Sequence, residues 1–213
     1  MRKRVATVLA IVVSMLLCVA VSATAADDDI TALVDSGRTA LAEGNYQEAL
    51  DLFQQVVQKI QAMVSQSFEQ FLPGALTGWT AGEIESQSWA GTTGEGSHRM
   101  THLTREYTRE KDDARCTINI TNWPHLVQGF QQSMQAYKQM EQLMSADPRM
   151  QVEVDSKDEW TILKVVDSTE KTVQLSAVHK KLMVSIEVDK EEVAVAEEYL
   201  GKINLTGLAG AAK

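Results

Sequence analysis

Hydrophobic positions in the first third of the chain recur at the spacing of a helix. Residues 31–43 place five small or apolar residues on one helical face: Leu33, Val34, Gly37, Ala40 and Leu41. A second series continues in steps of three and four residues from Tyr46 to Leu72. Gly44 and Asn45 separate the two series, and both residue types tolerate the left-handed backbone that ends a helix. The pattern therefore predicts a helical hairpin over residues 26–72, which Pro73 ends.

This hairpin resembles a single tetratricopeptide unit over residues 31–62. Five residues match positions of the family. Gly37 matches the small residue where the two helices touch, and Gly44 and Tyr46 match the turn. Ala49 matches the close packing of the second helix, and Phe53 matches its bulky residue. The resemblance implies that Gly37 and Ala49 let two helices approach closely and that Phe53 fills the space between them.

The chain also departs from the family pattern. Ala40, Val56 and Gln61 stand where the family usually carries a large aromatic, a small residue and a terminating proline. The second helix is therefore expected to run on, and no second copy of the unit follows. One unit buries too little surface to be stable alone. The hairpin is expected to dock on the rest of this chain, on a copy of itself or on another protein.

From Leu76 onwards the hydrophobic period changes from helical to alternating. Seven segments read as strands, in 79–89, 101–109, 114–121, 150–154, 159–166, 171–178 and 181–188. One polar face on each strand indicates an antiparallel sheet with one side covered. The glycine-rich stretch 90–98 lacks the lysine and following helix of a phosphate-binding loop, so we expect a flexible turn there.

Two further helices are predicted among the strands. One spans residues 124–145, and the other begins at Asp189, with Glu192 at the spacing of a capping box. The final stretch GLAGAAK is expected to be a frayed tail. The element order predicts an α+β fold with about six to seven antiparallel strands over residues 73–213. This order, with a proline-to-tryptophan entry at FLPGALTGW, resembles PsbP-like α/β/α sandwich domains, which implies no particular activity.

The first 25 residues have the pattern of a secretory signal peptide. A basic start at Arg2, Lys3 and Arg4 is followed by an apolar run and a small-x-small site at Ala23-Thr24-Ala25. We expect cleavage there, with an exported, periplasmic or secreted product and no stable membrane span afterwards. Removing the three basic residues takes the net charge from −9 to −12. Such an acidic chain repels nucleic acid, so protein partners are favoured.

Candidate chemistry in the sequence is sparse. His98 and His102 have a metal-binding spacing but no third ligand nearby, and two solvated imidazoles are the alternative. Met134, Met140 and Met144 share the 124–145 helix, where thioethers suit either Cu(I) or an adaptable core. Cys116 alternates with buried positions on its strand and is expected to be a buried thiol.

No catalytic motif is visible, so the sequence favours an exported, non-enzymatic binding protein without a cofactor. The interaction surface is expected on the hairpin or on the groove between the sheet and the 124–145 helix. The alternative is a domain that binds a small molecule or a metal, Cu(I) or Zn²⁺, in that same groove.

Overall fold

The computed structural model describes residues 28–93, 96–144, 149–190 and 192–211. The described residues begin with two helices, over residues 28–42 and Tyr46–Glu69 (α2). They precede a sheet of seven antiparallel strands and three more helices, so the α+β prediction is confirmed. Within the described residues, no helix combines the length and the apolar character needed to span a bilayer.

Contacts divide the chain into two compact units, Met1–Met63 and Val64–Lys213. Helix α2 continues through this boundary, so its last turns belong to the second unit. The sequence pattern placed the boundary later, after Leu72, because the apolar stripe continues that far. Each unit is described below by itself.

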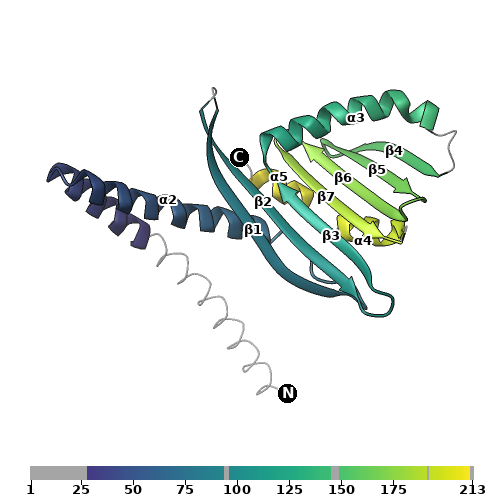
Figure 1. Cartoon of the computed structure of the whole chain (residues 1–213), viewed down its shortest axis with the longest axis horizontal. Helices are drawn as coiled ribbons and strands as arrows, with labels where there is room; N and C mark the ends of the chain where they lie inside the picture. Colours follow the sequence, from purple (N-terminus) through teal and green to yellow (C-terminus); the bar gives the residue numbers. More distant parts are fainter. Residues whose placement is uncertain (1–27, 94–95, 145–148, 191, 212–213) are drawn as a thin grey trace, which may run out of the picture. The chain divides into compact units, whose positions relative to one another are not determined.

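The sheet has the strand order β1-β2-β3-β7-β6-β5-β4, in which every neighbouring pair is antiparallel (Figure 1). The strands span Thr80–Thr93, Gly96–Arg109, Ala114–Thr121, Met150–Lys157, Trp160–Asp167, Thr172–His179 and Leu182–Asp189, numbered β1 to β7 along the chain. The two edge strands are therefore β1 and β4. Strand β1 has a register shift between Ala81 and Ile84, a bulge that interrupts its pairing with β2.

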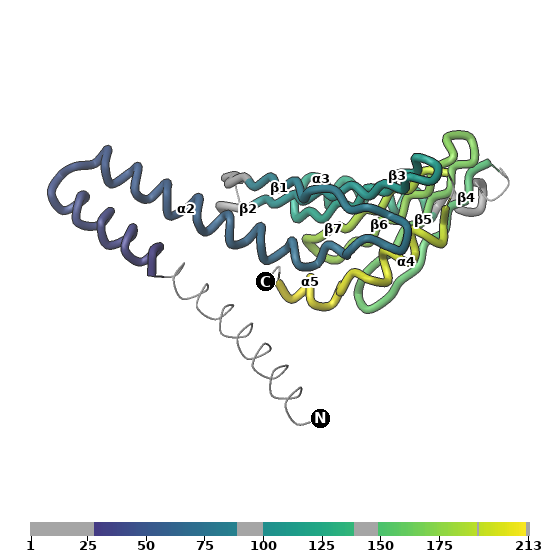
Figure 2. Tube along the Cα trace, turned by 90° about the horizontal axis from the view of Figure 1, so that it is seen from below, coloured from purple at the N-terminus to yellow at the C-terminus, as the bar shows by residue number. Residues whose placement is uncertain are grey.

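Helices cover both faces of the sheet, so the expectation that only one side is covered is wrong; strand residues alternate between two apolar clusters. The larger cluster packs one face against α4 (Val193–Lys202), α5 (Leu205–Ala211), Phe68 at the end of α2 and Leu72 just after it. The smaller cluster packs α3 (Pro124–Met144) on the other face, through Val127 and Met134 against β5 and β6. Figure 2 shows α4 and α5 together on one side of the strands.

Two buried tyrosines fix the segment that enters the sheet. The hydroxyl of Tyr107 on β2 donates to the carbonyl of Pro73 over 2.6 Å. The hydroxyl oxygen of Tyr199 on α4 accepts from the backbone N–H of Leu76 over 3.4 Å. The two rings lie 4.7 Å apart between centroids, and Trp79 meets Tyr199 edge-on at 6.2 Å. This aromatic cluster satisfies backbone groups that would otherwise be buried without partners.

Three sequence predictions about local structure are wrong. Most of the stretch 90–98 is strand and not a turn, since β1 runs to Thr93 and β2 begins at Gly96. The C-terminal stretch is not frayed, because α5 forms there and Leu208 is fully buried. Asp189 does not start the last long helix but ends β7, and α4 begins at Val193.

Glu192 does not form the predicted capping box but an ion pair with Arg109. It makes no side-chain cap and instead accepts from Arg109 Nη1 at 2.8 Å. Arg109 also donates to Asp112, Nε to Oδ1, at 2.9 Å. The Arg109 guanidinium lies 4.9 Å from the centre of the Trp79 ring. This ion cluster joins the β2–β3 hairpin to the start of α4.

The ion cluster predicts a loss of stability in acid. The hydrogen bond from Arg109 lowers the pKa of Asp112 from 3.8 to about 2. A lowered carboxyl pKa contributes stability that is complete above the unfolded value and disappears as the pH falls through the folded value. The urea midpoint of the native chain should therefore fall between pH 4 and pH 2 more steeply than that of Asp112→Asn.

An exposed turn residue supplies the matched control for this measurement. Asp158→Asn removes a carboxylate outside the ion cluster and should leave the acid slope of the native chain unchanged. An Asp112→Asn chain with the native slope would show that the ion pair does not stabilise the folded state.

Candidate functional site

The helical hairpin turns through a Schellman motif. Gly44 has a left-handed backbone with φ +82°, as its residue type permits. The N–H of Asn45 donates to the carbonyl of Ala40 over 2.9 Å, and the N–H of Gly44 to that of Leu41 over 3.2 Å. These two bonds satisfy the last carbonyls of the first helix and reverse the chain directly into α2.

Small residues bring the two helices together. A Cβ added at Gly37 would lie 2.9 Å from Cε1 of Phe53, so the glycine leaves the space that the ring fills. Ala40 and Ala49 are both buried between the helices. The interhelix contact expected at Gly37 is thus made with Phe53. Tyr46, by contrast, is 73% exposed and does not close the turn by packing.

One flank of the hairpin is apolar and open to solvent. Five of the six large exposed hydrophobic residues in the described part of the chain fall within residues 41–63. Tyr46, Leu50 and Val57 are separated by four and seven residues and share one side of α2, with exposed fractions of 73%, 51% and 43%. We call these three residues and Leu41, which is 53% exposed at the end of the first helix, the apolar flank. Isolated exposed hydrophobic residues need no explanation, whereas an aligned group is a candidate interaction surface.

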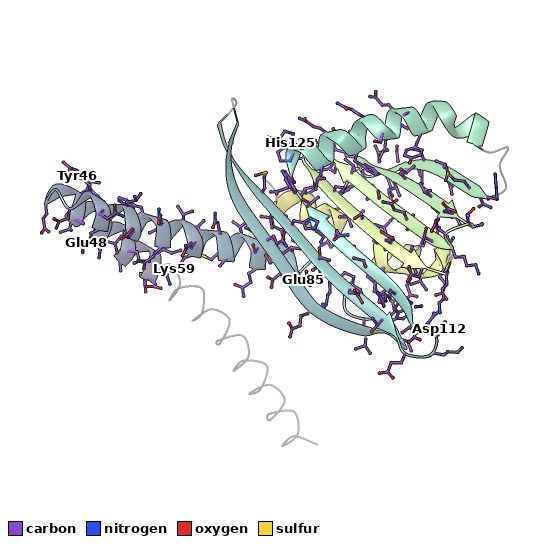
Figure 3. All side chains as sticks on the ribbon, in the orientation of Figure 1. Tyr46, Glu48, Lys59, Glu85, Asp112 and His125 are labelled. Atoms are coloured by element: carbon purple, nitrogen blue, oxygen red, sulfur yellow. The ribbon has the colours of Figure 1, made fainter. Side chains whose placement is uncertain are left out.

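The opposite flank is polar. A shallow groove of about 370 Å³ runs between the two helices and is lined mainly by Asp35, Thr39, Glu43 and Glu48. Figure 3 shows Tyr46 and Glu48 leaving α2 on different sides, as their two-residue spacing requires. The hairpin therefore separates an apolar surface from an acidic one.

A second hollow lies between α3 and the sheet, where the sequence placed the alternative binding groove. It has a volume of about 340 Å³ and is open to solvent. Its lining combines α3 with the neighbouring ends of β5 and β6: Gln131, Met134, Gln135, Lys138, Glu159, Thr161, Val178 and Lys180. Of the three methionines predicted to share this helix, Met134 is buried in the core beneath it. The side chains of Met140 and Met144 lie outside the described residues.

The predicted histidine pair falls on β2. The side chain of His98 lies outside the described residues, whereas Nε2 of His102 lies 3.2 Å from the Thr104 hydroxyl. Burial lowers the pKa of His102, which favours its neutral form. Across the described residues, no group of three or more His, Cys, Asp or Glu side chains could hold a metal ion.

Cys116 lies at the centre of the sheet and is fully buried, as its strand pattern predicted. Burial raises the pKa of its thiol to about 12, so the thiolate that nucleophilic or metal chemistry needs is scarce near neutral pH. The thiol is a core residue with no access to a substrate.

Comparison with known proteins finds no matching family model, no similar curated protein and no similar solved structure. The geometry of the chain itself therefore carries the functional argument.

The sequence reading missed that α2 carries two apolar stripes instead of one. Ala49 and Val56 pack on the first helix, while Tyr46, Leu50 and Val57 form the apolar flank. All five were visible as helical apolar positions. The signal that separates them is spacing, because residues seven apart return to nearly the same side of a helix.

The contact at Gly37 predicts a loss of stability on enlargement. Gly37→Leu would drive a side chain into the Phe53 ring and should cost about 1–3 kcal/mol, the usual range for overpacking. Urea unfolding followed by helical circular dichroism measures this change. Gly129→Ala is the matched control, because nothing lies within 4 Å of its added Cβ and alanine favours a helix. Equal stability of Gly37→Leu and the native chain would exclude the close contact.

Proposed function

We propose that this chain is an exported, non-enzymatic binding protein whose interaction surface is the apolar flank of its helical hairpin. The observation that carries the proposal is the alignment of Tyr46, Leu50 and Val57 on one side of α2, exposed to solvent. The signal-peptide pattern of residues 1–25 supports export, although those residues lie outside the described part of the chain.

Burial of the apolar flank is the physical driving force for binding. Removing apolar surface from water contributes roughly 25 cal/mol per Å², and tyrosine is one of the residue types that most often contribute strongly to an interface. The flank offers a tyrosine and three aliphatic side chains on rigid helices, so little conformational entropy is lost on binding. The Schellman turn and the contact between Gly37 and Phe53 hold the two helices in place.

A charge on the flank should abolish binding without unfolding the hairpin. Leu50 and Val57 are exposed, and lysine is a good helix former, so Leu50→Lys and Val57→Lys should fold normally. The complete chain is expressed, purified and immobilised, and its mass records whether residues 1–25 have been removed. Proteins recovered from an extract of the same cells are identified, repurified and titrated against each variant. We expect at least a tenfold loss of affinity in both variants.

Gln55→Lys is the matched control, because Gln55 is exposed on α2, half a turn from the flank. It adds the same charge and should bind like the native chain. Equal affinity across all four chains would overturn the role of the flank. Complete absence of association in the native chain, with itself or any other protein, would overturn the binding function.

The hollow beneath α3 supports a second candidate function, the binding of a small molecule; for a metal its lining offers a single carboxylate, Glu159, beside two lysines. Its volume of about 340 Å³ falls in the lower range of ligand sites, and Lys138, Lys180 and Glu159 offer charged groups at its rim. Calorimetry with Cu(I), Zn²⁺ and a panel of metabolites tests this candidate. A ligand of the hollow should bind more weakly to Gln131→Leu than to the native chain and equally well to Gln55→Lys. The absence of a binding heat for every compound of the panel would remove this candidate.

A further inference from the structure

The apolar flank of α2 belongs to a regular seam. Tyr46, Leu50, Phe53, Val57 and Ile60 are separated by four, three, four and three residues, the spacing by which two helices pack along a common line. Phe53 and Ile60 are half-buried, whereas the other three residues are exposed. The seam is therefore half-covered within the hairpin and open along its outer side.

The residues beside the seam differ sharply between its two sides. On the inner side Ala49 and Val56 are buried against the first helix. On the outer side the corresponding positions, seven residues apart, are all glutamine: Gln47, Gln54 and Gln61. The side-chain amide of Gln47 donates a hydrogen bond to the carboxylate of Asp51 over 3.2 Å, and this carboxylate is the one nearest to the glutamine row. Glutamine is uncharged, so the outer border row carries no charge of its own, and Asp51 lies directly behind it.

An uncharged border selects the kind of partner. The chain as a whole carries a net charge of −9, so contact between two copies is repulsive over most of the surface. The acidic groove formed by Asp35, Glu43 and Glu48 lies on the other flank and would stay away from such an interface. A basic partner would need a row of carboxylates along the seam for ion pairs, and the seam has none. The seam of a second copy would instead bring its glutamines against these glutamines, and their side-chain amides can hydrogen-bond to one another.

We propose that the seam is the interface between two copies of this chain, paired antiparallel as a four-helix bundle built from two hairpins. This inference rests on the proposed function and names the partner at the same surface. An antiparallel pairing opposes the two helix dipoles. It also makes the two chains continue from α2 at opposite ends of the interface. Phe53, at the middle of the seam, then meets its own counterpart.

The oligomeric state of the complete chain tests the proposal directly. Size-exclusion chromatography coupled to light scattering should give the mass of two chains for the native protein and for Gln55→Lys at micromolar concentration. Leu50→Lys and Val57→Lys should give the mass of one chain with unchanged helical circular dichroism. A native monomer, or a dimer that survives both flank substitutions, would overturn the proposal.

Disulfide trapping tests the antiparallel arrangement. With the two-fold axis between Phe53 and Gln54, Leu50 of one copy faces Val57 of the other, so a mixture of Leu50→Cys and Val57→Cys chains should cross-link under mild oxidation. Either variant alone should cross-link several-fold less, and Cys116 is buried and does not compete. Efficient cross-linking of each variant with itself would show parallel helices and overturn the arrangement.

The two proposals can fail separately. A monomeric native chain that still binds another protein through Leu50 and Val57 would overturn self-association alone. A monomeric chain without any partner at the flank would overturn both.

Discussion

The sheet unit depends on the contact between Tyr107 and Tyr199. Their rings are fully buried and join β2 to α4, which are far apart in the chain. Each hydroxyl also bonds to the segment between α2 and β1, through Pro73 and Leu76. Burial without these bonds would leave two hydroxyls and two peptide groups unsatisfied, at a cost of about 1–3 kcal/mol each. The pair therefore ties the entry of the sheet, its centre and its closing helix into one core.

The elements whose hydrophobic period is regular could be read from the sequence. Strand β3 alternates buried Cys116, Ile118 and Ile120 with more exposed neighbours, as its apolar pattern requires. Helix α2 was predictable for the same reason, since its apolar residues recur every three or four positions. In both cases the side chain alone reports which face is buried.

The elements that depend on distant partners could not be read in this way. Residues near Gly91 look like a turn but pair with β2 around His98, because a ladder needs only backbone groups. Glu192 has the spacing of a capping residue, yet its carboxylate bonds to Arg109, 83 positions away. Leu208 lies in a weakly patterned tail that becomes a helix when it is buried in the core, and Asn204 caps its first turn. The candidate site shows the same division: the hairpin and the spacing of its two stripes could be read from the sequence, but which stripe the first helix covers could not.

The order of the strands has a consequence for aggregation. An open sheet offers unpaired backbone at both ends, and a flat edge recruits strands from other molecules. Here the bulge in β1 bends that edge, and the side chain of Arg105 donates to the carbonyl of Gly82 over 3.0 Å. At the other end, Glu153, Asp155 and Lys157 leave β4 as exposed charges that an incoming strand would have to desolvate. These features oppose extension of the sheet into fibres, whereas the hairpin carries five of the six large exposed hydrophobic residues in the described part of the chain.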